Sequence, residues 1–163
     1  MDLITALAVS IGLLGGVATY LFLSFGMGLQ IWAAFIGWAS YYHCGGQTKG
    51  LMDSIAGAVW GALMAAAAFY LMGVLGLPGA IGPAVAVAIT VFILVMGAKV
   101  PILSSIPAGV YGYASTVALT LLGKDFAPAG SLLAVPALNV AISMIIGAIF
   151  GYISQQLAGA LSK

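Results

Sequence analysis

The stretch Leu51–Val74 reads LMDSIAGAVWGALMAAAAFYLMGV, and after Asp53 it carries no charged side chain. A helix needs about 20 mostly apolar residues to cross the roughly 30 Å hydrocarbon core of a bilayer. This stretch meets that requirement without help from any other part of the chain. It therefore predicts a membrane-spanning helix, and it indicates the class of fold for the segments on either side.

Five further segments are apolar enough to be interpreted in the same way, and short runs with glycine, proline or charged residues separate them. They are too long for the strands of a membrane barrel and lack the alternating pattern of such strands. The whole chain, residues 1–163, is thus predicted to be an all-α integral membrane protein folded as a single bundle of six transmembrane helices. Besides Leu51–Val74, the expected spans are Leu3–Phe25, Leu29–His43, Ile81–Ala98, Pro101–Leu122 and Leu132–Leu161.

The ends of some spans are ambiguous. The segment Leu29–His43 is short, so it either lies with little tilt or ends at a thinned interface. Pro107 leaves two alternatives for the fifth span, because proline removes a backbone hydrogen bond inside a helix. The helix is either kinked there, or it begins near Pro107 with Ser105 as its cap, leaving residues 100–106 irregular.

The composition excludes several classes of protein. Hydrophobic residues make up 64% of the chain and charged residues only 4%, with a mean hydropathy of +1.24. An average soluble domain has about 25% charged residues, so a soluble enzyme is not expected. A net charge of +1 spread along the chain provides no basic patch for nucleic acid.

The two halves of the chain, roughly residues 1–76 and 77–163, are weakly similar. Residues 31–40, IWAAFIGWAS, align with residues 106–115, IPAGVYGYAS, and residues 57–61, GAVWG, align with residues 147–151, GAIFG. Three spans in each half would give the halves opposite orientations, and such 3+3 inverted-topology repeats recur in transporters. The alternative is that short matches arise by chance in a chain with 23 glycines.

Uncharged polar and aromatic side chains at membrane depth are the candidates for contact with a solute. A narrow pore can select a small polar molecule with aromatic rings and a few hydroxyls. The alternative is that these side chains form hydrogen bonds between helices. The predicted pore-lining residues are Trp38, Ser40, Tyr113, Ser115 and Asn139.

Ionisable groups are scarce in the predicted spans. No carboxylate or histidine falls at a predicted midplane, which disfavours ion-coupled pumping. His43 and Cys44 provide only two of the ligands that a metal needs, and a glycine turn beside interfacial aromatic residues is the favoured interpretation. We expect no metal, no cofactor and no catalytic residue, and we do not expect an enzyme.

The lysines predict the orientation of the chain. With six spans, Lys49, Lys99 and Lys163 share one side of the membrane with the amino terminus, and Lys124 lies on the other side. Positive charge is enriched in cytoplasmic loops, so both termini are expected in the cytoplasm. The amino terminus has no basic region before its apolar segment, so we do not expect a removed signal peptide.

Several motifs resemble a known family. The residues 35–42, FIGWASYY, followed by Gly45-Gly46 and residues 49–51, KGL, are similar to the YcdZ-type family of small bacterial inner-membrane proteins, a family of unknown function. Pro107 with Gly112 and Ala114, and residues 149–152, IFGY, add to the likeness. The resemblance implies a multi-pass protein of the bacterial inner membrane, and it supplies neither a substrate nor functional residues.

These observations predict a passive channel or facilitator for a small polar, mostly uncharged solute such as urea, ammonia or formate. Its expected partners are the lipid bilayer, the solute and further copies of the chain, with a trimer expected by analogy. The alternative is a scaffold or accessory subunit that binds a partner membrane protein without transport. A further alternative is an exporter that uses a proton bound at His43.

Overall fold

The computed structural model describes residues 1–26 and 28–162. Lys163, one of the lysines used to predict orientation, lies outside them. All regular elements in these residues are helical. The helices are α1 (Leu3–Ser24), α2 (Ile31–His43), α3 (Gln47–Leu75), α4 (Ile81–Met96), α5 (Ile106–Leu122) and α6 (Pro136–Leu161), with short 3₁₀ turns η1 (Gly97–Lys99), η2 (Pro101–Leu103) and η3 (Leu132–Ala134).

Four of the helical segments are long and apolar enough to cross a membrane, which confirms an all-helical protein suited to a bilayer. The helix α4 alone has 16 residues and reaches this length by continuing through η1 to Lys99, whereas the remaining two helices are α5, with 17 residues, and α2, with 13. At 1.5 Å per residue α2 is about 20 Å long, which is less than the hydrocarbon thickness. The number of spans in the bilayer therefore remains a prediction. The four long segments are Leu3–Ser24, Gln47–Leu75, Ile81–Lys99 and Pro136–Leu161.

Two of the predicted spans begin too early. Residues before Ile106 form the turns η1 and η2, and α5 begins with Pro107 in its first turn, so the alternative with irregular backbone before Pro107 is the correct one. Ser105 occupies the cap position but makes no capping hydrogen bond. The sixth helix begins at Pro136, because proline suits the first turn of a helix and the residues before it form η3.

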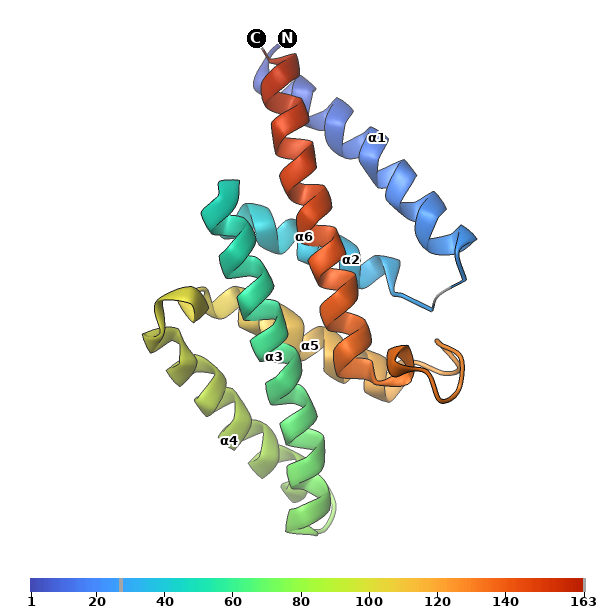
Figure 1. Cartoon of the computed structure of the whole chain (residues 1–163). Coiled ribbons are helices and arrows are strands. Elements are labelled where there is room, and N and C mark those ends of the chain that lie inside the picture. Colours follow the sequence, from blue (N-terminus) through green and yellow to red (C-terminus); the bar gives the residue numbers. More distant parts are fainter. Residues whose placement is uncertain (27, 163) are drawn as a thin grey trace.

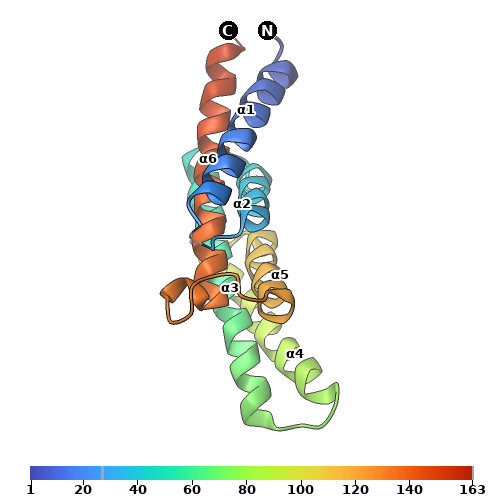
Figure 2. The same cartoon turned by 90° about the vertical axis from the view of Figure 1, so that its right-hand side faces the viewer.

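Two long helices, α3 and α6, lie side by side at the centre of the molecule (Figure 1). Figure 1 shows α1 beside α6 at the end that holds both termini, and α4 beside α3 at the opposite end. The short helices α2 and α5 lie between these ends, where α2 packs on α6 and α5 packs on α3. The turned view in Figure 2 shows the same elongated shape, with α1 and α4 at opposite ends.

The crossing of α2 and α6 requires glycine on both helices. A Cβ added to Gly37 would lie 2.2 Å from the carbonyl oxygen of Met144, and one added to Gly147 would lie 1.8 Å from the carbonyl oxygen of Ala34. No real Cβ approaches an oxygen so closely. Small residues let helix backbones approach in a membrane, where van der Waals contact replaces the hydrophobic effect as a driving force.

The crossing of α5 and α3 is built in the same way. A Cβ on Gly112 would lie 2.1 Å from the carbonyl oxygen of Ala58, and one on Gly61 would lie 1.9 Å from that of Gly109. Each crossing therefore pairs one glycine from the short helix with one glycine from the long helix. In this comparison Gly61 corresponds to Gly147, whereas the sequence alignment pairs Gly57 with Gly147. Each long helix has one pair of glycines four residues apart, Gly57 with Gly61 and Gly147 with Gly151, so the alignment is shifted by one helical turn.

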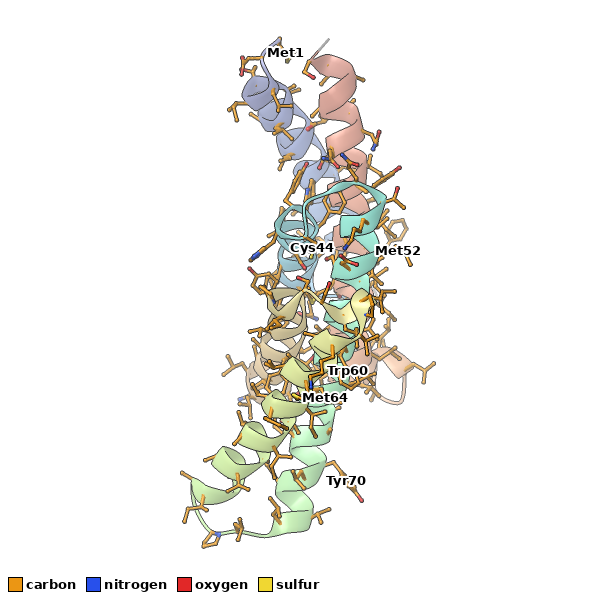
Figure 3. All side chains as sticks on the ribbon, turned by 90° about the vertical axis from the view of Figure 1, so that its left-hand side faces the viewer. Met1, Cys44, Met52, Trp60, Met64 and Tyr70 are labelled. Atoms are coloured by element: carbon orange, nitrogen blue, oxygen red, sulfur yellow. The ribbon has the colours of Figure 1, made fainter. Side chains whose placement is uncertain are left out.

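The outer helix α4 is held to α3 by aromatic and thioether side chains. The indole N–H of Trp60 donates to the carbonyl oxygen of Leu94 at 3.2 Å, and Met64 packs beside it. Figure 3 shows Trp60 and Met64 on the side of α3 that meets α4, whereas Tyr70 points outward. Tyr70 is 76% exposed, as a residue facing lipid would be.

Candidate functional site

Trp38 is buried where α2 meets α6, and its indole nitrogen has a hydrogen-bond partner. Its indole N–H donates to the Oγ of Ser154 at 3.1 Å, and the hydroxyl of Tyr42 lies 2.8 Å from the same oxygen. The Ser154 hydroxyl donates its own proton to the carbonyl oxygen of Gly151 at 2.7 Å. Both lone pairs and the proton of Ser154 thus have partners, which ties the second half of α2 to α6.

Ser40 and Tyr113 also make hydrogen bonds between helices. The Oγ of Ser54 in α3 donates to the Oγ of Ser40 at 2.8 Å, and both residues are buried. The hydroxyl of Tyr113 lies 3.0 Å from the Oγ1 of Thr90 in α4. Because Thr90 donates to the carbonyl oxygen of Ala86 at 2.9 Å, Tyr113 is the donor in this pair.

Asn139 lies near the start of α6 and is completely buried. Its side-chain amide donates to the carbonyl oxygens of Gly28 and Leu133, each at 2.9 Å. Ser143, one turn later, donates to the Oδ1 of Asn139 and accepts the backbone N–H of Gln30 at 3.0 Å. Asn139 therefore joins the linker before α2 to the linker before α6, a role that the sequence interpretation missed.

The five predicted pore-lining residues do not form one site within the part of the chain that the structure describes. Ser115 is buried like the other four, and no hydrogen bond joins any two of the five. Tyr113 lines a surface cleft together with residues such as Val87 and Leu121, and the lining of that cleft is mainly apolar. A pore-lining role for these residues stays a prediction.

A second polar cluster, absent from the sequence interpretation, closes the turn between α2 and α3. The hydroxyl of Tyr41, which is buried, donates to the Oε1 of Gln155 in α6. The backbone N–H of Gln47 approaches both oxygens at 2.8 Å. Gly46 adopts a φ of +69°, and a Cβ there would lie 2.8 Å from the side chain of Gln155. We call Tyr41, Gln155, Gln47 and Gly46 the Tyr41 cluster.

His43 and Cys44 connect α2 to the start of α5. The Nδ1 of His43 lies 2.8 Å from the hydroxyl of Tyr111, and the thiol of Cys44 donates to the Oγ of Ser105 at 3.2 Å. Figure 3 places Cys44 at the turn that follows α2. Among the described residues, no group of three or more potential metal ligands comes together.

The charged side chains lie near helix ends. Lys49 and Asp53 form an ion pair one turn apart at the start of α3. At the start of α1, the Asp2 carboxylate accepts the hydroxyl of Thr5 at 2.6 Å and its backbone N–H at 3.0 Å. These hydrogen bonds favour the ionised form and lower the pKa of Asp2.

A family model described as "Protein of unknown function (DUF1097)" matches residues 8–159. The chain belongs to the DUF1097 family. The match covers all six helices of this DUF1097 protein, including the glycine crossings and the Tyr41 cluster. No curated protein and no solved structure matches the chain. The resemblance to a family of unknown function is thus confirmed, and the YcdZ-type name stays an expectation.

Proposed function

We propose that this DUF1097 protein is a passive channel or facilitator for a small polar, mostly uncharged solute. The observation that carries the proposal is the likeness of the two glycine crossings, α2 on α6 and α5 on α3. The packing of α1 on α6 and of α4 on α3 extends the likeness to all six helices. This arrangement supports two three-helix repeats of opposite orientation, an architecture that recurs in transporters.

The charge distribution favours passive movement over ion coupling. Groups that carry protons or sodium through a membrane are ionisable side chains within the spans. In the described residues the only buried carboxylate is that of Asp53, and Lys49 neutralises it at the start of α3. We infer that the solute moves down its own gradient.

The proposal also includes the location and assembly of the protein. We propose that it lies in the bacterial inner membrane with both termini in the cytoplasm, and that it assembles into a homo-oligomer such as a trimer.

The test is solute flux into proteoliposomes, followed by stopped-flow light scattering. We expect vesicles with the protein to equilibrate at least several times faster than empty vesicles for one of urea, ammonia, formate or glycerol. Water permeability serves as the control for leaky vesicles. If vesicles with the protein and empty vesicles equilibrated at the same rate for every solute, with the reconstituted oligomers intact, the channel would be contradicted.

A scaffold or accessory subunit is the second candidate, and one observation favours it. Hydroxyl and indole groups at membrane depth, such as those of Trp38, Ser40 and Tyr113, are engaged in bonds between helices. A scaffold would retain one defined membrane protein during purification in mild detergent. Purification of the chain without such a partner, together with solute flux, would exclude this alternative.

A further inference from the structure

A small cleft opens between α3, α5 and the start of α6. Its volume is about 190 Å³, enough for a molecule with a few non-hydrogen atoms. Thr116 and Thr120 of α5 supply its polar side chains, and Phe69 and Pro136 are among the apolar residues that complete it. No charged side chain lines it, which favours a neutral occupant over an anion or a cation.

Thr116 has a hydroxyl without a partner in the described part of the chain. The residue is 1% exposed, and its Oγ1 is buried and makes no hydrogen bond. Thr19, Thr90 and Thr120 behave differently, because each donates to the carbonyl oxygen four residues earlier at 2.7–2.9 Å. A buried polar group without a partner is costly, so the hydroxyl of Thr116 has an unused hydrogen bond that a molecule reaching it would satisfy.

The equivalent place in the other half of the chain is filled. The alignment of residues 31–40 with residues 106–115, continued by one residue, pairs Tyr41 with Thr116. The hydroxyl of Tyr41 has partners within the protein, Gln155 and the backbone N–H of Gln47. The side chain of Thr116 is smaller than that of Tyr41, so a cleft remains beside it. In the other half of the chain, the Tyr41 cluster fills the equivalent place.

We propose that the cleft beside Thr116 binds a small neutral molecule with both hydrogen-bond donors and acceptors, of the amide or alcohol class, and that the Thr116 hydroxyl contacts it directly. The inference rests on the proposed function and specifies where the solute binds. It also favours urea or glycerol over formate, because an anion would find no positive charge in the cleft. In the other half of the chain, the Tyr41 cluster would fill the equivalent place and close the solute pathway there.

The first test measures binding without transport. Cys44→Ser removes the single cysteine, and Ala137→Cys places a thiol at the cleft lining. We expect urea, at concentrations that leave the protein folded, to slow the reaction of this thiol with a small uncharged maleimide. The control thiol is Gly12→Cys on α1, where no atom lies within 4 Å of the added Cβ, and its rate should not change with urea.

Thr116→Val then removes the hydroxyl and keeps the shape of the side chain. We expect it to weaken protection by urea about fivefold, as the loss of one hydrogen bond would. The Thr116→Val variant should be as stable as the wild type or more stable, because the substitution removes a buried hydroxyl that has no hydrogen-bond partner. The matched control is Thr19→Val, whose hydroxyl bonds within α1 and lies outside the cleft.

The outcomes separate this inference from the proposed function. Protection of the thiol that depends on Thr116, without flux of any tested solute in proteoliposomes, would support the site and refute the channel. Urea flux that Thr116→Val leaves unchanged would support the channel and refute the site. Equal protection by urea and formate, or none by urea or glycerol, would overturn the assignment of a neutral ligand.

Discussion

Gly61→Ala and Gly147→Ala are each expected to lower the free energy of unfolding by about 3 kcal/mol or more. In each case the added methyl group would lie within 2 Å of a carbonyl oxygen on the crossing helix, and backbone cannot move aside as a flexible side chain can. Alanine is the better helix former by about 1 kcal/mol, so the steric term must exceed that gain. Unfolding of the purified protein in mixed detergent, followed by helicity, measures the change.

The matched control for these two variants is Gly12→Ala in α1. No atom of the described chain lies within 4 Å of a Cβ at this position, so the gain in helix propensity should be the only effect within one protomer. We expect Gly12→Ala to be neutral or stabilising. If Gly61→Ala matched Gly12→Ala in stability, the close crossing of α5 and α3 would be wrong.

The sizes of the two effects also test the internal symmetry. Gly61 and Gly147 occupy equivalent crossings with almost equal approach distances, 1.9 and 1.8 Å. An inverted repeat therefore predicts similar losses for both variants. A large loss for one and none for the other would count against two equivalent halves.

The sequence predicts the helical segments well because apolar runs of the right length have few other stable forms. Its errors lie where local signals compete, as at Pro107, which suits both a kink and a first turn. The helix α5 begins at Ile106 because the preceding residues form 3₁₀ turns, which apolar composition does not reveal. The alignment pairs Gly57 with Gly147, one turn away from the pairing of Gly61 with Gly147 in the structure. The cause is similar, since two glycines four residues apart allow two alignments of α3 with α6.

The candidate site was harder to predict, because partners of polar side chains come from distant parts of the chain. Trp38 and Ser154 are 116 residues apart, and no local pattern joins them. The sequence identified Trp38, Ser40, Tyr113 and Asn139 as polar or aromatic residues at depth; in the structure the first three form hydrogen bonds between helices, and Asn139 bonds to two linkers. Only its missing hydrogen bond distinguishes Thr116 from Thr19, Thr90 and Thr120, and the sequence does not reveal that difference.

Asn139 provides the second large effect, and it tests directly whether a predicted pore residue is a packing residue. Asn139→Leu removes two donors, so it leaves the carbonyl oxygen of Leu133 without its amide partner and that of Gly28 with only the side-chain amide of Gln30. No backbone N–H of the described residues donates to the carbonyl oxygen of Leu133 in the turn η3, so we expect the free energy of unfolding to fall by about 2–4 kcal/mol. The linker before α2 should also become accessible to protease, because Asn139 no longer holds Gly28.

The control is Gln156→Leu, which removes an exposed amide from the same helix and should change stability by less than about 0.5 kcal/mol. Flux measurements on the same variants distinguish the two roles of Asn139. A packing residue lowers stability and exposes the linker, and flux per folded protein stays close to that of the wild type. If Asn139→Leu were as stable as Gln156→Leu and yet abolished solute flux, Asn139 would be a solute contact, and the hydrogen bonds to the two linkers would be secondary to that role.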